Sequence, residues 1–401
     1  MIADLHCHYP MHVMMDEPRE RVDRVVQVRH RPFGDKFRGL VLRIASALLS
    51  DRDLWSGERV NVDYLERGKA RIVLSVLHSP FSEIDLGRSY GSPPASSYFA
   101  DLLEQIDRVE ADVAHWGSDR MRLVSDLESL RGTIQDEDGP IAMIHCLEGG
   151  VDLGDTADEI RANVATLKQR GVAYVTLAHL FYRQVATNAP ALPFLPDRVY
   201  NWVFRQPKGG GLTERGRVAV EALARNRILV DLAHMRADSI AETFEILDAV
   251  APDIPVVNTH AGYRFGKQEY MLDAPTIERI ASRGGVVGLI LAQHQLKDGI
   301  SKKDIERMAK ETRKLTDSED LAQTLAVICM HVERIREITG NHRHVAIGSD
   351  FDGFIKPTMA GLENMADMAR LEQALTKRYG DDARLITHQN AVDMLEKLWT
   401  T

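Results

Sequence analysis

Eight short apolar runs, each followed by a segment long enough for a helix, constrain the fold of this 401-residue chain more than any other feature. They read IADL at 2, RIVLSVL at 71, IAMI at 141, AYVTLA at 173, ILVDLA at 228, PVVNT at 255, VVGLIL at 286 and HVAIGS at 344. Short continuous runs rich in β-branched residues are typical of strands buried on both faces, as in parallel sheets. The sequence therefore predicts eight buried strands.

Amphipathic segments separate these runs, among them 157–171, 213–227, 239–250 and 274–285. A strand followed by a helix, repeated eight times, predicts a (β/α)8 barrel of the TIM type, with a doubly wound open sheet as the alternative. Two long segments, 10–70 and 78–140, interrupt the pattern after the first and second strands. They contain helical patterns at 37–49 and 98–116, so we expect long inserted loops and helices over the barrel mouth. No break in composition marks a second domain, and residues 1–401 are expected to form one domain.

The histidines favour the barrel over the open sheet. Eight of the fifteen lie within or just beyond the C-terminal ends of the predicted strands: His6, His8, His78, His145, His179, His234, His260 and His294. A random distribution would place only a small minority there. A (β/α)8 barrel gathers the C-terminal ends of all its strands around one mouth, where active sites lie. The mouth is therefore the predicted site.

The charge balance argues against a nucleic-acid partner, because 59 acidic residues face 50 basic ones and no run of Lys or Arg stands out. A small-molecule substrate fits better. Met1 leads directly into the first apolar run without a signal-peptide pattern, and no apolar stretch approaches the roughly 20 residues of a membrane span. The three cysteines are widely spaced. We expect a cytoplasmic protein with reduced cysteines and no membrane segment.

A metal site is indicated by the first motif, DLHCH. Alternate side chains of a strand point to the same side, so His6 and His8 converge on one point. Glu148 follows the third strand, His234 the fifth and His260 the sixth. Four imidazoles and a carboxylate are too many for one catalytic zinc, which takes three protein ligands. They suit two divalent metal ions bridged by Glu148.

Two aspartates in GSDFDG close the eighth strand. Asp350 lies nearer the strand end and is our candidate for the general base and acid, because a carboxylate beside a metal-activated water can take its proton and pass it on. Asp352 is more consistent with a structural carboxylate that accepts hydrogen bonds from turn amides.

The ordered motifs DLHCH, EGG, VTLAH, GLTERGR, LVDLAH, THAGYR and GSDFDG together resemble the membrane (renal) dipeptidase family of the amidohydrolase superfamily, over residues 4 to about 355. The resemblance implies a (β/α)8 barrel with two zinc ions that cleaves dipeptides and tolerates a D-configured C-terminal residue. It also implies that a homodimer is common among relatives. The site residues that it implies are the ligands His6, Glu148, His234 and His260, the acid/base Asp350, and His179 as the group that binds the substrate oxyanion.

Two positions depart from the family pattern. The family has His-x-Asp in the first motif, where this chain has His8 in place of the aspartate. Neutral imidazole leaves the metal pair more positive, which lowers the pKa of the attacking water and alters metal preference. The family arginine that holds the dipeptide carboxylate is also absent from the stretch KQEYMLDAP. Arg264, in THAGYR, and Lys267 are the nearby basic residues that could supply that substrate contact, and Arg264 is our candidate.

We therefore predict a binuclear metal-dependent hydrolase, a dipeptidase or a related amidase, with zinc as the first choice of metal. The nearest alternative is a hydrolase of lactones or phosphoesters, since TatD-like nucleases combine a similar ligand set with the same barrel. Those proteins are shorter, and an acidic chain does not supply the basic surface that a nuclease needs. A third alternative is a barrel that binds metal without catalysis.

Overall fold

The computed structural model describes residues 1–13, 36–39, 58–79, 83, 89–95, 97–136, 138–192, 195–353 and 358–400. Within these ranges the chain forms one sheet of nine parallel strands. The strands are β1 (Ile2–Cys7), β2 (Ala70–His78), β3 (Met121–Leu123), β4 (Ile141–Glu148), β5 (Tyr174–Thr176), β6 (Leu229–Asp231), β7 (Asn258–Ala261), β8 (Val287–Leu289) and β9 (Val345–Ile347).

Eight of these strands form the barrel. They are hydrogen-bonded in the order β6-β5-β4-β2-β1-β9-β8-β7. A parallel bridge between Asp231 and Val257 then joins the two ends, with Leu232 donating its amide proton to the Val257 carbonyl at 2.9 Å. The predicted (β/α)8 barrel is confirmed. All strand C-termini therefore meet on one rim.

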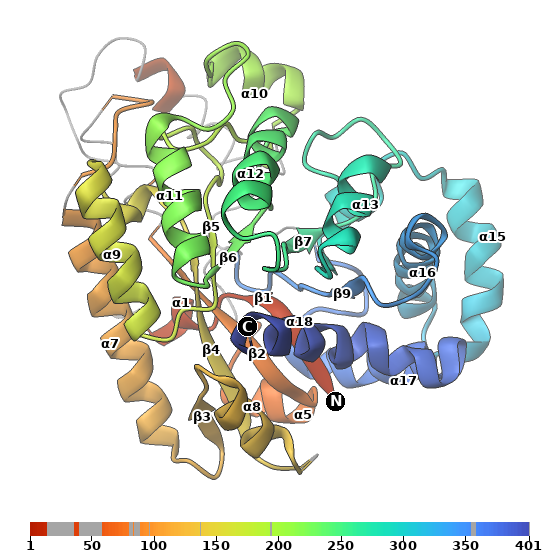
Figure 1. Ribbon diagram of the computed structural model, residues 1–401. Helices are drawn as coiled ribbons and strands as arrows, with labels where there is room; N and C mark the ends of the chain where they lie inside the picture. The colour runs from red at the N-terminus through yellow and green to blue at the C-terminus, as the bar shows by residue number, and fades with distance from the viewer. Residues whose placement is uncertain are drawn as a thin grey trace.

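Helices on the outside of the barrel connect the strands (Figure 1). The principal ones are α7 (Ser97–Trp116), α9 (Ala157–Gln169), α11 (Glu214–Arg225), α12 (Ala237–Val250), α13 (Ala274–Ser282), α15 (Lys302–Thr312), α16 (Glu319–Thr339), α17 (Met368–Tyr379) and α18 (Asn390–Thr400). Shorter ones are α1 (Pro10–Val13), α5 (Val62–Arg67), α8 (Leu127–Ile134), α10 (Asp197–Val203) and α14 (Gln293–Leu296). The four amphipathic segments named above all form helices, and α7 confirms the helix expected over 98–116.

One strand was not predicted. β3 contains three residues, and two of them, Arg122 and Leu123, are exposed, so it lacks the buried apolar pattern that marks the others. It pairs with the first half of β4, whereas β5 pairs with the end of β4. The helix predicted over 37–49 lies largely outside the described residues.

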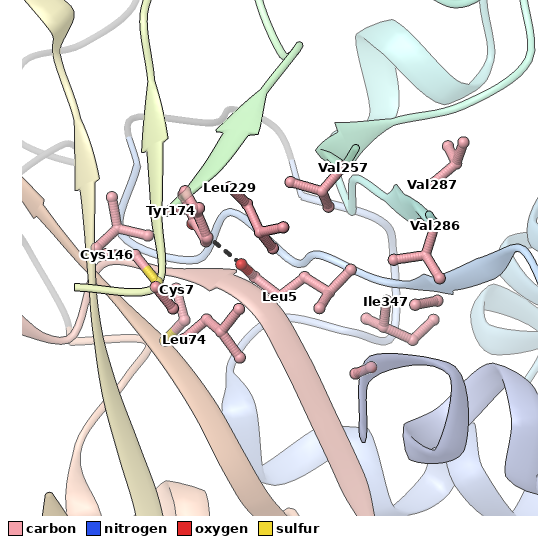
Figure 2. Close-up of a cluster of buried hydrophobic side chains, with 14 of the residues drawn as sticks. Leu5, Cys7, Leu74, Cys146, Tyr174, Leu229, Val257, Val286, Val287 and Ile347 are labelled. Carbon is pink, nitrogen blue, oxygen red and sulfur yellow. Dashed lines mark hydrogen bonds between the residues drawn. The ribbon is translucent and has the colours of Figure 1, made fainter. Parts of the chain in front are cut away.

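The strands bury a continuous apolar core, part of which Figure 2 shows around Leu5, Cys7, Cys146 and Tyr174. Close backbone contact at β7 depends on glycine. A Cβ atom at Gly288 would lie 1.9 Å from the Thr259 carbonyl oxygen, and one at Gly348 would lie 1.7 Å from it. Both values are far below a van der Waals contact, so only glycine lets β7 sit this close to β8 and to the end of β9.

Candidate metal centre

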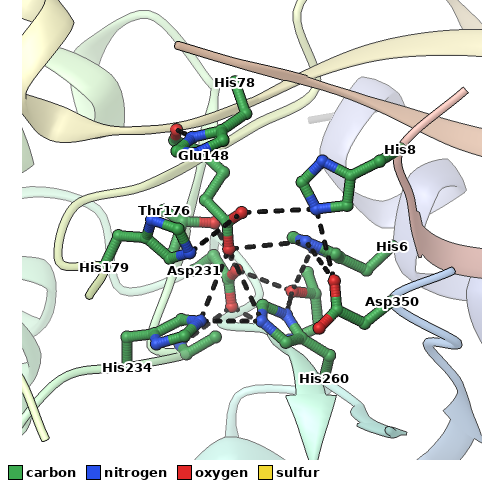
Figure 3. A network of polar contacts seen from close by, with 12 residues as sticks. His6, His8, His78, Glu148, Thr176, His179, Asp231, His234, His260 and Asp350 are labelled. Carbon is green, nitrogen blue, oxygen red and sulfur yellow. Dashed lines mark hydrogen bonds and ion pairs between the residues drawn. The ribbon is translucent and has the colours of Figure 1, made fainter. Parts of the chain in front are cut away.

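Five histidines, one glutamate and one aspartate converge at the C-terminal rim (Figure 3). His6 lies in β1 and His8 directly follows it, Glu148 ends β4, and His179, His234 and Asp350 follow β5, β6 and β9. His260 lies in β7. All seven residues are at most 8% exposed. The structure thus brings together His6, His8, Glu148, His179, His234, His260 and Asp350, as the sequence predicts.

The two oxygens of Glu148 face different sets of imidazoles. Oε1 lies 3.4 Å from His6 Nε2 and 3.5 Å from the Nε2 atoms of His234 and His260. Oε2 lies 3.4 Å from the Nε2 atoms of His8 and His179. A carboxylate whose two oxygens face separate nitrogen groups has the geometry required to bridge two cations.

The spacing of the donors fits a metal. Two ligand atoms bound to one tetrahedral zinc at about 2.0–2.1 Å lie about 3.3–3.4 Å apart, close to the N···O separations around Glu148. Several of these buried atoms also make no hydrogen bond within the described part of the chain, namely His6 Nε2, both nitrogens of His8, and Glu148 Oε1. Buried polar atoms without partners are rare in folded proteins. Two overlapping groups, His6–His8–Glu148 and Glu148–His234–His260, have ligand spacing.

The electrostatics of the site favour a bound cation. Burial raises the pKa of Glu148, but the surrounding imidazoles, His179 and His6 foremost, hold it well below its usual range. Burial lowers the pKa of His8, but the carboxylates of Asp350 and Glu148 outweigh it and raise that pKa to about 10. Burial lowers the pKa values of His234 and His260, which leaves them neutral, the form that binds metal.

His179 is held from behind by a residue that sequence reasoning missed. Its Nδ1 atom donates to Glu83 Oε2 at 2.6 Å, and its Nε2 atom faces Glu148. Glu83 is 5% exposed and also accepts the Phe181 amide proton at 2.6 Å. Glu83 lies in the segment inserted after β2, where no periodic pattern or motif distinguishes it from the other acidic residues.

Two residues of the rim adopt left-handed backbone conformations that are uncommon for residues other than glycine. The φ angles of His234 and Asp350 are 64° and 58°. Such strain persists where surrounding structure holds it, often at functional sites. It turns Asp350 Oδ1 to 3.2 Å from His8 Nε2 and 3.8 Å from His6 Nε2.

Asp352 accepts hydrogen bonds from backbone amides, as the sequence suggested, but these amides belong to a distant segment and not to its own turn. Its carboxylate accepts the amide protons of Arg59 and Val60, with Val60 at 3.0 Å, and pairs with His12 Nε2 at 2.7 Å. It therefore fastens the segment before α5 to the rim.

Three histidines that were expected at the barrel mouth, His78, His145 and His294, do not belong to the group of seven residues described above. His78 joins the site, with Nδ1 2.9 Å from the Glu148 carbonyl oxygen. His145 points outward instead, and its Nε2 lies 3.6 Å from Glu110 of α7. It lies inside β4, one residue out of phase with Glu148 and Cys146, so strand alternation turns it away. His294 lies in α14, beyond the strand end, and neither of its ring nitrogens makes a hydrogen bond among the described residues.

Arg264 follows β7, and two of its guanidinium nitrogens are held by its own loop. Nε donates to the Met271 carbonyl at 2.7 Å and Nη2 to the Glu269 carbonyl at 3.0 Å. The loop thus fixes the orientation of the guanidinium plane.

The sequence model of the membrane dipeptidases, peptidase family M19, matches residues 28–400. The chain belongs to this family. Its members are metal-dependent hydrolases, and the His/Glu groups at the rim suit such a metal. His6 and His8 precede the matched residues, so the departure at His8 lies outside them.

Relatives in this family are distant. Dipeptidase aclJ of Aspergillus oryzae is 24% identical over 281 residues, 69% of this chain. Dipeptidase verJ of Clonostachys rogersoniana is 25% identical over 280 residues, again 69% of this chain. The matches span only 56% and 59% of those two relatives. An uncharacterized protein from the pqqA 5′ region of Klebsiella pneumoniae is 25% identical over 305 residues, 74% of this chain and 96% of its own length.

Solved structures share the fold over the whole chain. A dipeptidase of family M19 superposes with a TM-score of 0.68 at 18% identity, covering 100% of this chain and 99% of that one. A metallopeptidase from Rhodobacter sphaeroides, bound to a phosphinate mimic of the dipeptide L-Ala-D-Ala, gives 0.67 at 16% identity, with 99% of each chain covered. None of the helices in the described ranges combines the length and apolarity needed to cross a bilayer.

Proposed function

We propose that this protein is a binuclear metal-dependent dipeptidase that hydrolyses a dipeptide to two amino acids and accepts a D-configured C-terminal residue. The observation that carries the proposal is Glu148, whose two oxygens each lie 3.4–3.5 Å from the ring nitrogens of a different set of histidines. Family membership supports the reaction class. The Rhodobacter sphaeroides relative, which binds a mimic of L-Ala-D-Ala, supports the stereochemical preference.

His6, His8 and Glu148 would hold one ion, and Glu148, His234 and His260 would hold the other, because these two groups have ligand spacing; zinc is the first choice. His6 lies beside the Glu148 oxygen that also faces His234 and His260, so it lies between the two groups. Bound divalent ions polarise a carbonyl group and lower the pKa of water. Asp350 takes the proton of the attacking water and transfers it to the departing amine nitrogen, a role that suits a carboxylate at the edge of the ligand cluster.

His179 binds the carbonyl oxygen of the scissile bond. Because Glu83 accepts the Nδ1 proton, Nε2 is the atom presented to the substrate, and it donates a hydrogen bond to the oxygen as negative charge develops there. Burial lowers the pKa of His179, but the charges of Glu148 and Glu83 raise it to about 9, which favours a protonated donor. Arg264 offers its remaining nitrogen, Nη1, to the substrate carboxylate.

The test is a turnover assay of the zinc-loaded full chain. Dipeptides with L- and D-configured C-terminal residues are compared with an N-acyl amino acid, a lactone and a phosphodiester. Hydrolysis of dipeptides, lost on chelation and restored by zinc, is expected. Activity confined to the phosphodiester or the lactone would show that the protein is a hydrolase of that substrate class and not a dipeptidase. Bound metal with no turnover of any substrate would show a barrel that binds metal without catalysis.

A further inference from the structure

A buried carboxylate lies directly behind the proposed metal ligands. Asp231, the last residue of β6, is fully buried. Its Oδ1 atom accepts the amide protons of Ala233 at 3.0 Å and Thr259 at 2.9 Å. Its Oδ2 atom accepts the hydroxyl proton of Thr176 at 2.6 Å (Figure 3). It also accepts the hydroxyl proton of Thr259 at 2.7 Å. Four donors fill the accepting positions of one carboxylate, so Asp231 is not itself a metal ligand although it lies within ligand distance of His6 and His260.

The hydroxyl of Thr259 links this carboxylate to two of the ligands. Since a carboxylate so placed only accepts, the single hydroxyl proton of Thr259 is directed to Asp231. The Thr259 oxygen must then act as an acceptor toward its other neighbours. These are Nδ1 of His260 at 2.8 Å and Nδ1 of His6 at 3.1 Å.

This arrangement fixes the tautomer of both imidazoles. An Nδ1–H group that donates to Thr259 leaves the lone pair on Nε2, and Nε2 is the atom that faces Glu148 in both His6 and His260. Partners of this kind orient metal-bound histidines and raise their basicity. Here one hydroxyl serves a ligand from each of the two groups, His6–His8–Glu148 and Glu148–His234–His260.

The two histidines depend on Thr259 to different degrees. Tyr174 donates its hydroxyl proton to the Leu5 carbonyl at 3.0 Å, so its oxygen also accepts from His6 Nδ1, at 2.9 Å. His6 therefore has two acceptors. For His260 Nδ1, Thr259 is the one hydrogen-bond partner within the described residues.

We infer that Thr259, anchored by Asp231, is a positioning residue that sets the metal-binding tautomers of His6 and His260, and that the subsite of His234 and His260 depends on it more strongly than the subsite of His6 and His8. The inference rests on the metal centre proposed above. It predicts that loss of the Thr259 hydroxyl weakens zinc binding at one subsite more than at the other, although every metal ligand is still present.

The test measures zinc affinity rather than turnover. Metal-free full-length protein is titrated with zinc in competition with a chromophoric chelator, and the variant His234→Ala identifies the step that belongs to the His234–His260 subsite. Thr259→Val removes the hydroxyl at nearly constant volume. We expect it to weaken that step about 10- to 100-fold and the other step much less. Thr259→Ser, which keeps the hydroxyl, should restore wild-type affinity.

Thr176→Val is the matched control, because it removes another buried hydroxyl that donates to Asp231 but makes no hydrogen bond to an imidazole among the described residues. It should leave both steps near their wild-type values. Unchanged binding by Thr259→Val, an equal loss in both steps, or an equal loss in Thr176→Val would overturn the inference. If Thr259→Val does not fold, Thr259→Ala, which leaves a small void, takes its place. If the wild type failed to bind two equivalents of zinc, both the proposed metal centre and the inference would be wrong.

Discussion

Glu83 accepts the Nδ1 proton of His179 at 2.6 Å, and this contact helps to join the segment inserted after β2 to the C-terminal rim of the barrel. The second carboxylate oxygen of Glu83 accepts the Phe181 amide proton at 2.6 Å, so both His179 and the backbone beyond it are held. The pair resembles arrangements in which an acidic residue holds a catalytic imidazole in one orientation.

Glu83→Gln should lower kcat by about 10- to 100-fold while KM changes by less than about threefold, because an amide offers one acceptor oxygen where two are used and His179 acts on developing charge. Steady-state kinetics on a hydrolysed dipeptide measure this. Glu110→Gln is the matched control, since Glu110 faces His145 on the outer side of β4 and should leave kcat unchanged. A normal kcat in Glu83→Gln would remove Glu83 from this role.

Asp350→Asn should keep both metal ions and lower kcat by about two orders of magnitude or more, because the amide cannot accept the proton of the attacking water. Metal content by elemental analysis and kcat are measured on the same preparation. Near-normal turnover would exclude Asp350 as the acid/base, and loss of metal would show it to be a ligand instead.

His8→Asp restores the residue type found in the family pattern. The added negative charge opposes deprotonation of the attacking water, so the acidic limb of the kcat/KM profile should move to higher pH by roughly half a unit or more. The profile is recorded from pH 5 to 9 at saturating zinc. A shift to lower pH would contradict the argument that the neutral imidazole leaves the centre more positive.

His331, which lies outside the candidate metal centre, makes the folding stability of the protein dependent on pH. It lies fully buried in α16, where Nδ1 accepts the Tyr263 amide proton at 3.0 Å and Nε2 donates to the Leu296 carbonyl at 2.9 Å. Burial lowers its pKa from 6.5 to about 4. The unfolded chain therefore binds a proton between these values that the folded chain does not, so stability falls as the pH falls from 6.5 toward 4.

The expected loss from His331 is up to about 3 kcal/mol at pH 4, by 1.36 kcal/mol for each pKa unit. His331→Gln should be less stable than wild type at pH 7 but should lose less stability on acidification. Urea unfolding of the metal-free proteins at pH 7.0, 5.5 and 4.5 provides the comparison. If the free energy of unfolding changed with pH by the same amount in the two proteins, His331 would be excluded as the titrating group.

The barrel and most of the ligand cluster could be predicted because they depend on patterns of short period. Strand alternation brings His6 and His8 to one side, and the same alternation explains why His145, one residue out of phase with Glu148, faces α7 instead. Strand ends meet at one rim in a barrel, which places Glu148, His234 and His260 together although long stretches of sequence separate them.

The supporting groups could not be predicted because they depend on three-dimensional contacts. Glu83 lies in an irregular segment, and Thr259 and Asp231 read as ordinary strand residues. The left-handed backbone conformation at His234 and Asp350 could not be predicted either, because neither position is occupied by glycine. β3 escaped notice because two of its three residues face solvent.

Gly288 and Gly348 allow their backbones to lie directly against the backbone of Thr259, with no side chain between them. Nothing there bears a functional group, yet a single methyl at either position would collide with the Thr259 carbonyl and displace the peptide that carries Thr259 and His260. Tolerance to substitution should therefore be low at these two positions, although neither carries a reactive side chain. We expect a variant there to be a metal-deficient enzyme whose ligands are all intact.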